Sequence, residues 1–273
     1  MWTEMEPYFR EEKLPHIWCP GCGNGIVMGS LVKAIDKLQL DRDKTVIVSG
    51  IGCSSRASGY LDFNTLHTTH GRALAFATGI KMVNPELTVF VLMGDGDSTA
   101  IGGNHFIHAA RRNIDLNAII FNNNIYGMTG GQYSPLTPPG SRATTAPYGT
   151  VERSFDLAEL AKAAGATYVA RSTTYHTKPL ANLIGSAVNN NGFSVVEAMT
   201  QCPVSYGRKN KLGDAANMLL WYKEHAVSVN RAEKMTPEEM RDKFLIGELY
   251  NQPAPEYTSE YQKVIDYARK GGR

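Results

Sequence analysis

Short apolar runs alternate with amphipathic stretches along the first three quarters of the chain. In residues 24–38, apolar side chains recur at helical spacing and share one face. Residues 45–49 form a β-branched run, and residues 87–93 are apolar without alternation, as in a strand that is buried on both faces. The same pattern predicts further helices at about 71–82, 104–112, 156–164 and 178–189, and strands at 117–121, 167–170 and 193–198. Alternating strands and helices predict an α/β fold with a doubly wound parallel sheet between two layers of helices.

The pattern changes after residue 204, where no further strand is predicted. Residues 205–273 resemble three helical pieces that are separated by polar turns. One piece starts at the sequence TPEE, with Thr236 as N-cap, proline at the first helical position and Glu239 placed for a capping box. We therefore expect an α/β domain of residues 1–204. A helical C-terminal arm of residues 205–273 would pack on that domain or on a partner subunit.

Polar or cysteine-bearing turns directly follow four of the predicted strands. These turns are Cys53, Gly94–Gly96, Asn122–Asn124 and Cys202. In open α/β sheets, ligands bind in the crevice outside the carboxyl ends of the strands. The sequence therefore predicts that this edge of the sheet is the active edge.

The segment from Gly94 to Asn124 has the composition of a diphosphate site. Gly94 and Gly96 allow the backbone to approach an anion, and the helix that follows points free N–H groups toward it. Twenty-five residues lie between Gly96 and Asn122, enough for one helix and one strand that returns beside Asp95. A carboxylate, an amide oxygen and a backbone carbonyl, with two phosphate oxygens and a water, complete an octahedral Mg²⁺ site. Either turn alone would be a simple strand end, but the two at this spacing favour a magnesium-bridged diphosphate.

Four cysteines provide a second possible site. Cys19 and Cys22 lie in the sequence HIWCPGCGNG before the first predicted strand, and Cys53 and Cys202 are isolated. A CxxC pair alone fits a redox dithiol, half of a zinc site or part of an iron–sulfur cluster. A structural zinc site usually has a second CxxC or a pair of histidines with three to five residues between them, and this chain has neither. The thiolate ligands of a [4Fe–4S] cluster need only converge in space, and Cys53 and Cys202 are expected at the same sheet edge.

Composition and charge indicate which partners and which cellular compartment to expect. The net charge of +2 gives no indication of a nucleic-acid or membrane partner. The N-terminal sequence lacks a signal pattern, and no apolar run reaches transmembrane length. Four cysteines in 273 residues fit a reducing compartment better than a disulfide framework. We expect a cytoplasmic protein.

Several motifs resemble a known family. The spacing from GDG to NN resembles the thiamine diphosphate fingerprint. The sequences WCPGCGNG, GIGCSSR, HTTHGRALAFATGIK and IYGMTGGQYSP resemble the β subunits of 2-oxoacid:ferredoxin oxidoreductases, most closely those specific for 2-oxoglutarate. The resemblance covers roughly residues 16–210 and implies the thiamine-diphosphate-binding fold, with this chain as its diphosphate-binding domain.

The resemblance also implies specific ligands. Magnesium would be held by Asp95, Asn123 and the carbonyl of Ile125, and one [4Fe–4S] cluster by Cys19, Cys22, Cys53 and Cys202. Further residues are expected to contact the cofactor, namely Gly52, Cys53, Ser54, His70, Gly94, Gly96, Asp97, Tyr126, Gly127, Met128 and Thr129. His70 and Arg56 are candidate catalytic residues. A packed histidine and a solvated arginine are the alternatives.

By this resemblance the activity is the reversible, coenzyme A-dependent oxidative decarboxylation of a 2-oxoacid, with 2-oxoglutarate converted to succinyl-CoA. An α subunit would supply the pyrimidine-binding domain and its activating glutamate, and ferredoxin would accept the electrons. Met128 stands where pyruvate-type relatives often carry asparagine, which counts against pyruvate. Pyruvate or a branched-chain 2-oxoacid, a non-redox thiamine diphosphate decarboxylase subunit, and a zinc-bearing interaction subunit without chemistry remain the alternatives.

Overall fold

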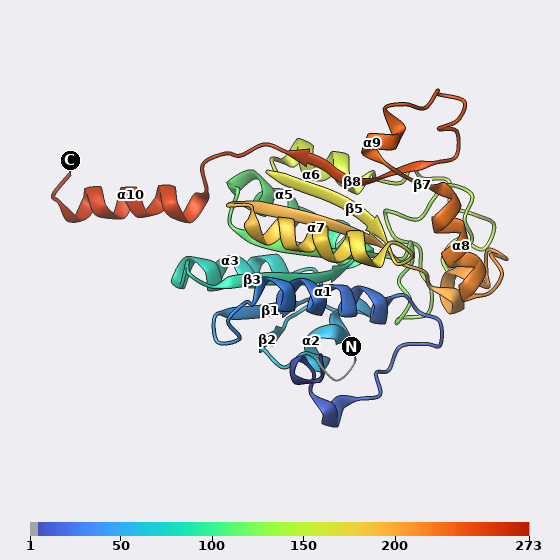
Figure 1. The fold of residues 1–273 in the computed structure, drawn as a ribbon, viewed down its shortest axis with the longest axis horizontal. Coiled ribbons are helices and arrows are strands. Elements are labelled where there is room, and N and C mark those ends of the chain that lie inside the picture. The colour runs from blue at the N-terminus through green and yellow to red at the C-terminus, as the bar shows by residue number, and fades with distance from the viewer. Residues whose placement is uncertain (1–4, 273) are drawn as a thin grey trace.

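One mixed β-sheet runs through the computed structural model, which describes residues 5–272 (Figure 1). Its strands follow the order β2-β1-β3-β4-β6-β5-β8-β7, and all neighbours are parallel except β5 and β8. The strands are β1 Thr45–Ser49, β2 Asn64–His67, β3 Thr88–Gly94, β4 Leu116–Asn122, β5 Tyr168–Thr173, β6 Phe193–Met199, β7 Ala226–Ser228 and β8 Phe244–Asn251. The expected parallel α/β core is confirmed, since the six strands before residue 200 are parallel to one another.

Helices cover both faces of this sheet. Those of the domain are α1 Asn24–Leu38, α2 Ala57–Tyr60, α3 Ala73–Val83, α4 Asp95–Thr99, α5 Gly103–Arg112, α6 Leu157–Ala164 and α7 Thr177–Asn189. Toward the C-terminus follow α8 Ala215–His225, α9 Val229–Ala232 and α10 Tyr257–Arg269. Single turns are η1 Glu6–Tyr8, η2 Glu11–Lys13, η3 Ser54–Arg56 and the π-helix η4 Pro203–Gly207. Helices α1 and α7 cover one face, and α3, α5 and α6 cover the other (Figure 1).

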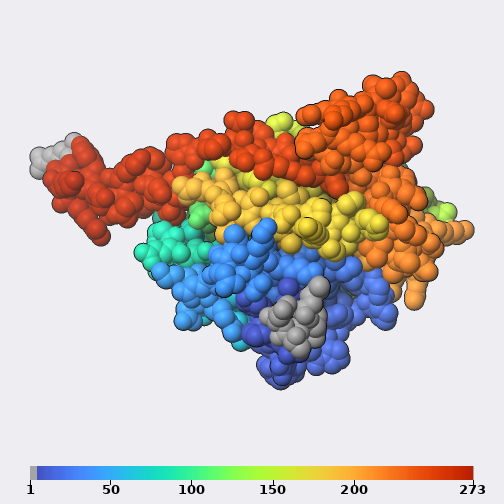
Figure 2. All heavy atoms as spheres, viewed as in Figure 1, coloured from blue at the N-terminus to red at the C-terminus, as the bar shows by residue number. Residues whose placement is uncertain are grey.

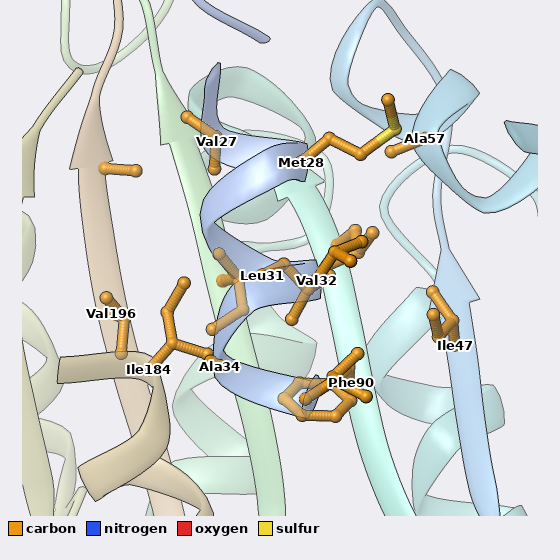
Figure 3. Packing of buried hydrophobic residues seen from close by; sticks show 14 of the residues in the cluster. Val27, Met28, Leu31, Val32, Ala34, Ile47, Ala57, Phe90, Ile184 and Val196 are labelled. Carbon is orange, nitrogen blue, oxygen red and sulfur yellow. The ribbon is translucent and has the colours of Figure 1, made fainter. Parts of the chain in front are cut away.

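Strand β3 is apolar without alternation because its side chains enter a hydrophobic core on each face of the sheet. Phe90 packs in the same cluster as Leu31 of α1 (Figure 3). Val91 packs in the opposite cluster with Leu74 of α3. Both faces of the strand are therefore buried, and each fully buried large side chain stabilises the fold by roughly 1.5–3 kcal/mol. The two cores hold the carboxyl ends of the strands in fixed positions.

The expectation of a purely helical arm after residue 204 is wrong, because β8 pairs antiparallel with β5 and β7 pairs parallel with β8. The sequence FLIGELYN of β8 has no clear alternation, and the pairing shifts register between Val169 and Ala170. Its strand conformation comes from pairing with a distant segment. The helix expected to start at Thr236 is only a turn, although its capping box is present. Thr236 N donates to Glu239 Oε2 at 2.8 Å, and Glu239 N donates to Thr236 Oγ1 at 3.3 Å.

The last amphipathic stretch forms α10, which extends away from the body of the molecule (Figure 2). Its base is fixed, since the Glu256 side chain accepts the backbone N–H groups of Thr258 and Ser259 at 2.9 and 2.8 Å. Beyond Thr258 the helix has no buried residue. The boundary between residues 204 and 205 stays a prediction. Among residues 5–272, no helix has the length and apolar character needed to cross a membrane.

Candidate active site

The turn after β3 places a carboxylate at the edge of the sheet. Strand β3 ends at Gly94, and α4 begins at Asp95, whose side chain is buried. The Ser134 hydroxyl donates to Asp95 Oδ2, and the backbone N–H groups of Gly96 and Asn123 lie near enough to the carboxylate to favour its charged form. Burial raises the pKa of Asp95 to about 7, although these hydrogen bonds lower it. A positive ion beside this carboxylate would favour its charged form.

The turn after β4 brings amide oxygens to the same place. Asn122 Nδ2 donates to Glu197 Oε1 at 2.7 Å, and Asn122 Oδ1 accepts the Asn124 N–H at 3.2 Å. Asn123 Oδ1 accepts the Ile125 N–H at 3.2 Å. The turn is therefore shaped by its own side chains, with Asn123 beside Asp95. A carboxylate, an amide oxygen and a backbone carbonyl are hard oxygen donors of the kind that Mg²⁺ binds, so these residues fit the predicted ion.

A cleft of about 40 Å³ joins these two turns to the end of β1. It is lined by all of the residues expected to contact the cofactor, namely Gly52, Cys53, Ser54, His70, Gly94, Asp95, Gly96, Asp97, Asn123, Ile125, Tyr126, Gly127, Met128 and Thr129, together with Ile51 and Phe121. The Tyr126 ring lies over the first turn, and its hydroxyl donates to the Gly96 carbonyl at 2.9 Å. A Cβ on Gly96 would lie 2.1 Å from Tyr126 Cζ, so only glycine fits there. The binding roles of these residues stay predictions.

His70 and Asp97 form a pair at one wall of this cleft. His70 Nδ1 contacts Asp97 Oδ1, which also accepts the Gly71 N–H at 2.7 Å. Burial raises the pKa of Asp97, while the Gly71 N–H and His70 lower it. The other candidate catalytic residue, Arg56, is exposed on η3 and does not line the cleft. The structure thus brings His70 to the site but not Arg56.

The four cysteines gather beside the cleft as free thiols. Cys53 Sγ and Cys202 Sγ lie 3.4 and 3.8 Å from the position that a Cβ would take on Gly127, which lines the cleft. Burial, followed by the neighbouring cysteines, raises the pKa of Cys22 to about 12 and that of Cys53 to about 11. Within residues 5–272, no group of three His, Cys, Asp or Glu side chains is placed to hold a single metal ion. Thiols that interact across such spacing fit a multi-iron cluster, whose sulfur ligands lie on different iron atoms.

Two contacts at this edge have no signal in the sequence. Ser134 lies in the quoted sequence IYGMTGGQYSP, but nothing in that motif indicates a contact with Asp95. Trp18 Nε1 donates to the Cys53 carbonyl at 2.7 Å and ties the CxxC segment to the end of β1. Both contacts join segments far apart in the chain, so only the fold reveals them.

A larger cavity, of about 760 Å³, lies on the other side of the Asn122–Asn124 turn. Apolar and aromatic side chains of α8 and β8 line it, among them Trp221 and Phe244. Its charged wall is the buried pair of Arg171 Nε and Glu197 Oε2, which are 2.6 Å apart. This cavity shares Asn123 with the small cleft, but none of the four cysteines lines it.

Residues 50–198 match the family model described as the thiamine pyrophosphate enzyme C-terminal TPP-binding domain. This span covers more than half of the chain and contains both turns that fit a magnesium diphosphate. The class of protein is therefore that of the enzymes dependent on thiamine diphosphate, also called thiamine pyrophosphate. The expected fold type is confirmed.

Comparisons over the full chain define the family further. The chain is 53% identical over 266 residues to 2-oxoglutarate synthase subunit KorB of Methanothermobacter thermautotrophicus, covering 97% of this chain and 92% of the relative. It is 52% identical over 271 residues to the protein of the same name from Archaeoglobus fulgidus, covering 99% and 98%. The 2-oxoglutarate:ferredoxin oxidoreductase of Magnetococcus marinus, solved with 2-oxoglutarate, coenzyme A and succinyl-CoA bound, matches with a TM-score of 0.87 at 34% identity, covering 98% of this chain and 91% of that chain. The chain belongs to the β-subunit family of the 2-oxoacid:ferredoxin oxidoreductases, and the resemblance found in its motifs is confirmed.

Proposed function

We propose that this chain is the β subunit of a 2-oxoglutarate:ferredoxin oxidoreductase. With an α subunit it converts 2-oxoglutarate and coenzyme A reversibly to succinyl-CoA and CO₂, and it passes the electrons to ferredoxin. The names of the relatives and the ligands of the solved neighbour support this substrate. The low cysteine count, four in 273 residues, fits a reducing compartment and supports a location in the cytoplasm.

One observation carries the redox assignment. Cys53 lines the small cleft and also belongs to the group of four thiols, and Gly127 lies against both. A cofactor in the cleft and a cluster on the thiols would therefore be direct neighbours. A non-redox decarboxylase has no use for that arrangement.

The residues of this chain have distinct tasks in such a site. Asp95, Asn123 and the Ile125 carbonyl hold magnesium and thereby the diphosphate. Asp97 fixes the His70 ring through Nδ1, which leaves Nε2 to meet the diphosphate or the substrate. When bound, thiamine diphosphate supplies the nucleophile for the 2-oxo carbon and accepts the electrons released with CO₂. Cys19, Cys22, Cys53 and Cys202 hold the [4Fe–4S] cluster, which supplies one-electron transfer.

The α subunit completes the site in this proposal. Its pyrimidine-binding domain provides the glutamate that activates the aminopyrimidine ring, together with much of the substrate and coenzyme A site. This chain alone is therefore expected to hold its cluster but to be inactive.

The proposal is tested on the anaerobically prepared αβ complex. We expect coenzyme A-dependent ferredoxin reduction with succinyl-CoA as product, and a kcat/KM for 2-oxoglutarate at least about tenfold above that for pyruvate. The complex with Asp95→Ala is the matched inactive control. A ratio that favours pyruvate contradicts the substrate, and full activity of the isolated chain contradicts the need for a partner.

A further inference from the structure

A basic cluster lies directly after the last cysteine. The π-helix η4 begins at Pro203, and the sequence RKNK follows at 208–211. Arg208, Lys209 and Lys211 are exposed, and so is Arg142 from the long loop after β4. We refer to these four side chains as the basic cluster.

Hydrogen bonds fix this cluster to the cysteine segment. The backbone N–H of Gly207 donates to the Cys202 carbonyl at 2.9 Å, and that of Arg208 donates to the Pro203 carbonyl at 3.0 Å. The side chain of Asn210 clamps Arg142, since Asn210 Oδ1 accepts the Arg142 N–H at 2.7 Å and Asn210 Nδ2 donates to its carbonyl at 3.0 Å. The four charges therefore sit on a platform that is connected by hydrogen bonds to Cys202.

The platform also lies close to the thiols in space. Lys209 Cε is 3.2 Å from the position of a Cβ on Gly131, and Ser205 Cβ is 3.5 Å from it. Ser205 Oγ in turn lies 4.0 Å from the corresponding position on Gly127, which contacts Cys53 and Cys202. Cys19 is itself exposed, so the proposed iron–sulfur cluster would lie near the surface, beside the positive charges of the basic cluster.

Nothing in the described chain neutralises these four charges. None of the four side chains forms an ion pair or donates a side-chain hydrogen bond to another residue among those the structure describes. The acidic residue of the same segment, Asp214, caps α8 by accepting the Asn217 N–H at 2.8 Å. The acidic residues of the N-terminal turns lie around a separate hollow with Asp62. A surface patch of positive charge attracts a partner with a negatively charged surface and increases the rate of association.

We propose that the basic cluster is the docking surface for the electron acceptor, a small iron–sulfur protein with an acidic face. This inference rests on the proposed function and adds the place where the acceptor binds. Oxidation of one 2-oxoacid with coenzyme A gives acyl-CoA, CO₂, one proton and two electrons. Each encounter at the basic cluster transfers one electron, so two reduced acceptor molecules leave per 2-oxoacid.

The test compares two acceptors on the αβ complex. The variant Arg208→Glu/Lys209→Glu and the second variant Arg142→Glu/Lys211→Glu are measured with an acidic ferredoxin and with methyl viologen, a small cation that needs no acidic docking face. We expect kcat/KM for ferredoxin to fall by about tenfold or more at low ionic strength, and kcat/KM for methyl viologen not to fall. The Kd for oxidised ferredoxin, measured by calorimetry, rises in parallel. The salt dependence of both quantities becomes weaker than in the wild type.

Lys33→Glu/Lys178→Glu, which reverses two exposed charges on α1 and α7, is the matched control and leaves all these values unchanged. An unchanged kcat/KM and Kd for ferredoxin overturn the proposal, as does an equal fall with both acceptors. A rise in the KM for coenzyme A, with kcat/KM and Kd for ferredoxin unchanged, also overturns the proposal. The basic cluster would then bind the phosphates of coenzyme A. Failure of the proposed function is distinct, because the wild-type complex would then reduce neither acceptor.

Discussion

The Gly94–Gly96 and Asn122–Asn124 turns and the four cysteines are neighbours at one edge of the sheet, but these two regions are built differently. Hydrogen bonds within the protein already hold the two turns in place, because Ser134 donates to Asp95 and Asn122 donates to Glu197. The group of four cysteines is assembled from thiols of separate segments, and burial opposes ionisation of the thiols of Cys22 and Cys53. The proposed diphosphate site is thus preorganised, whereas the thiols would need the positive charge of the proposed iron cluster to stabilise their ionised form. Changes at one site should therefore leave the other largely intact.

The largest effect is expected for Asp95→Ala. It removes the charged ligand of the magnesium bridge, so the affinity for thiamine diphosphate with Mg²⁺ should fall on the order of 100-fold or more. Iron content should stay at the wild-type level. Calorimetric titration and iron assays on one sample measure both, with the exposed Asp266→Ala as control. Unchanged cofactor affinity would remove the basis for the magnesium assignment.

For Cys202→Ala and for Cys22→Ala we expect a loss of iron with little change in cofactor affinity. Wild-type chain prepared without oxygen should hold about four irons with acid-labile sulfide, and each variant should lose most of them. The affinity for thiamine diphosphate should stay within about threefold, because Asp95 and Asn122 have hydrogen bonds of their own, to Ser134 and Glu197. Stoichiometric zinc without sulfide in the wild type would contradict the cluster, and full iron in Cys202→Ala would contradict the fourth ligand.

A smaller loss is expected for Asn123→Ala. The amide oxygen is a neutral and therefore weaker ligand than the carboxylate, and the Ile125 carbonyl remains. The cofactor affinity should fall by about tenfold, with a higher Mg²⁺ concentration for half-saturation. Asn190→Ala, at a partly buried amide far from this edge, is the control. An effect as large as that of Asp95→Ala would mean that the two ligands had been ranked wrongly.

The smallest effect is expected for Ser134→Ala, which removes one hydrogen bond from Asp95. A hydrogen bond to a charged group contributes about 1.5–3 kcal/mol, but bound magnesium offsets part of its loss. Cofactor affinity should therefore fall only a few-fold, and Ser134→Thr should restore most of it. No change in either variant would show that the Asp95 carboxylate is held by the backbone alone.

The sequence was sufficient for the parts of the molecule that depend on local patterns. Five of the six strands before residue 200 follow from apolar runs, whereas the sequence NTLH of β2 is mostly polar and exposed and did not predict a strand. The Gly94–Gly96 and Asn122–Asn124 turns indicate one part of the cleft, and the rest of its lining came from the family resemblance. Pairings between distant segments were out of reach. Strand β8 owes its conformation to β5, and Ser134 reaches Asp95 across thirty-nine positions. Trp18 likewise reaches the Cys53 carbonyl through the fold alone.

Strand β8 has a consequence for one side of the sheet. Without it, β5 would present a row of unpaired backbone groups, which is a template for polymerisation between chains. By running antiparallel, β8 pairs with that side of β5, and Gln252 N continues the pairing with a bond of 2.9 Å to the Thr167 carbonyl. The register of β8 against β5 allows little change of length within residues 244–251, whereas the exposed end of α10 can vary freely. The C-terminal segment thus combines β8, whose length is constrained by its pairing with β5, with the exposed end of α10, where length and sequence can change.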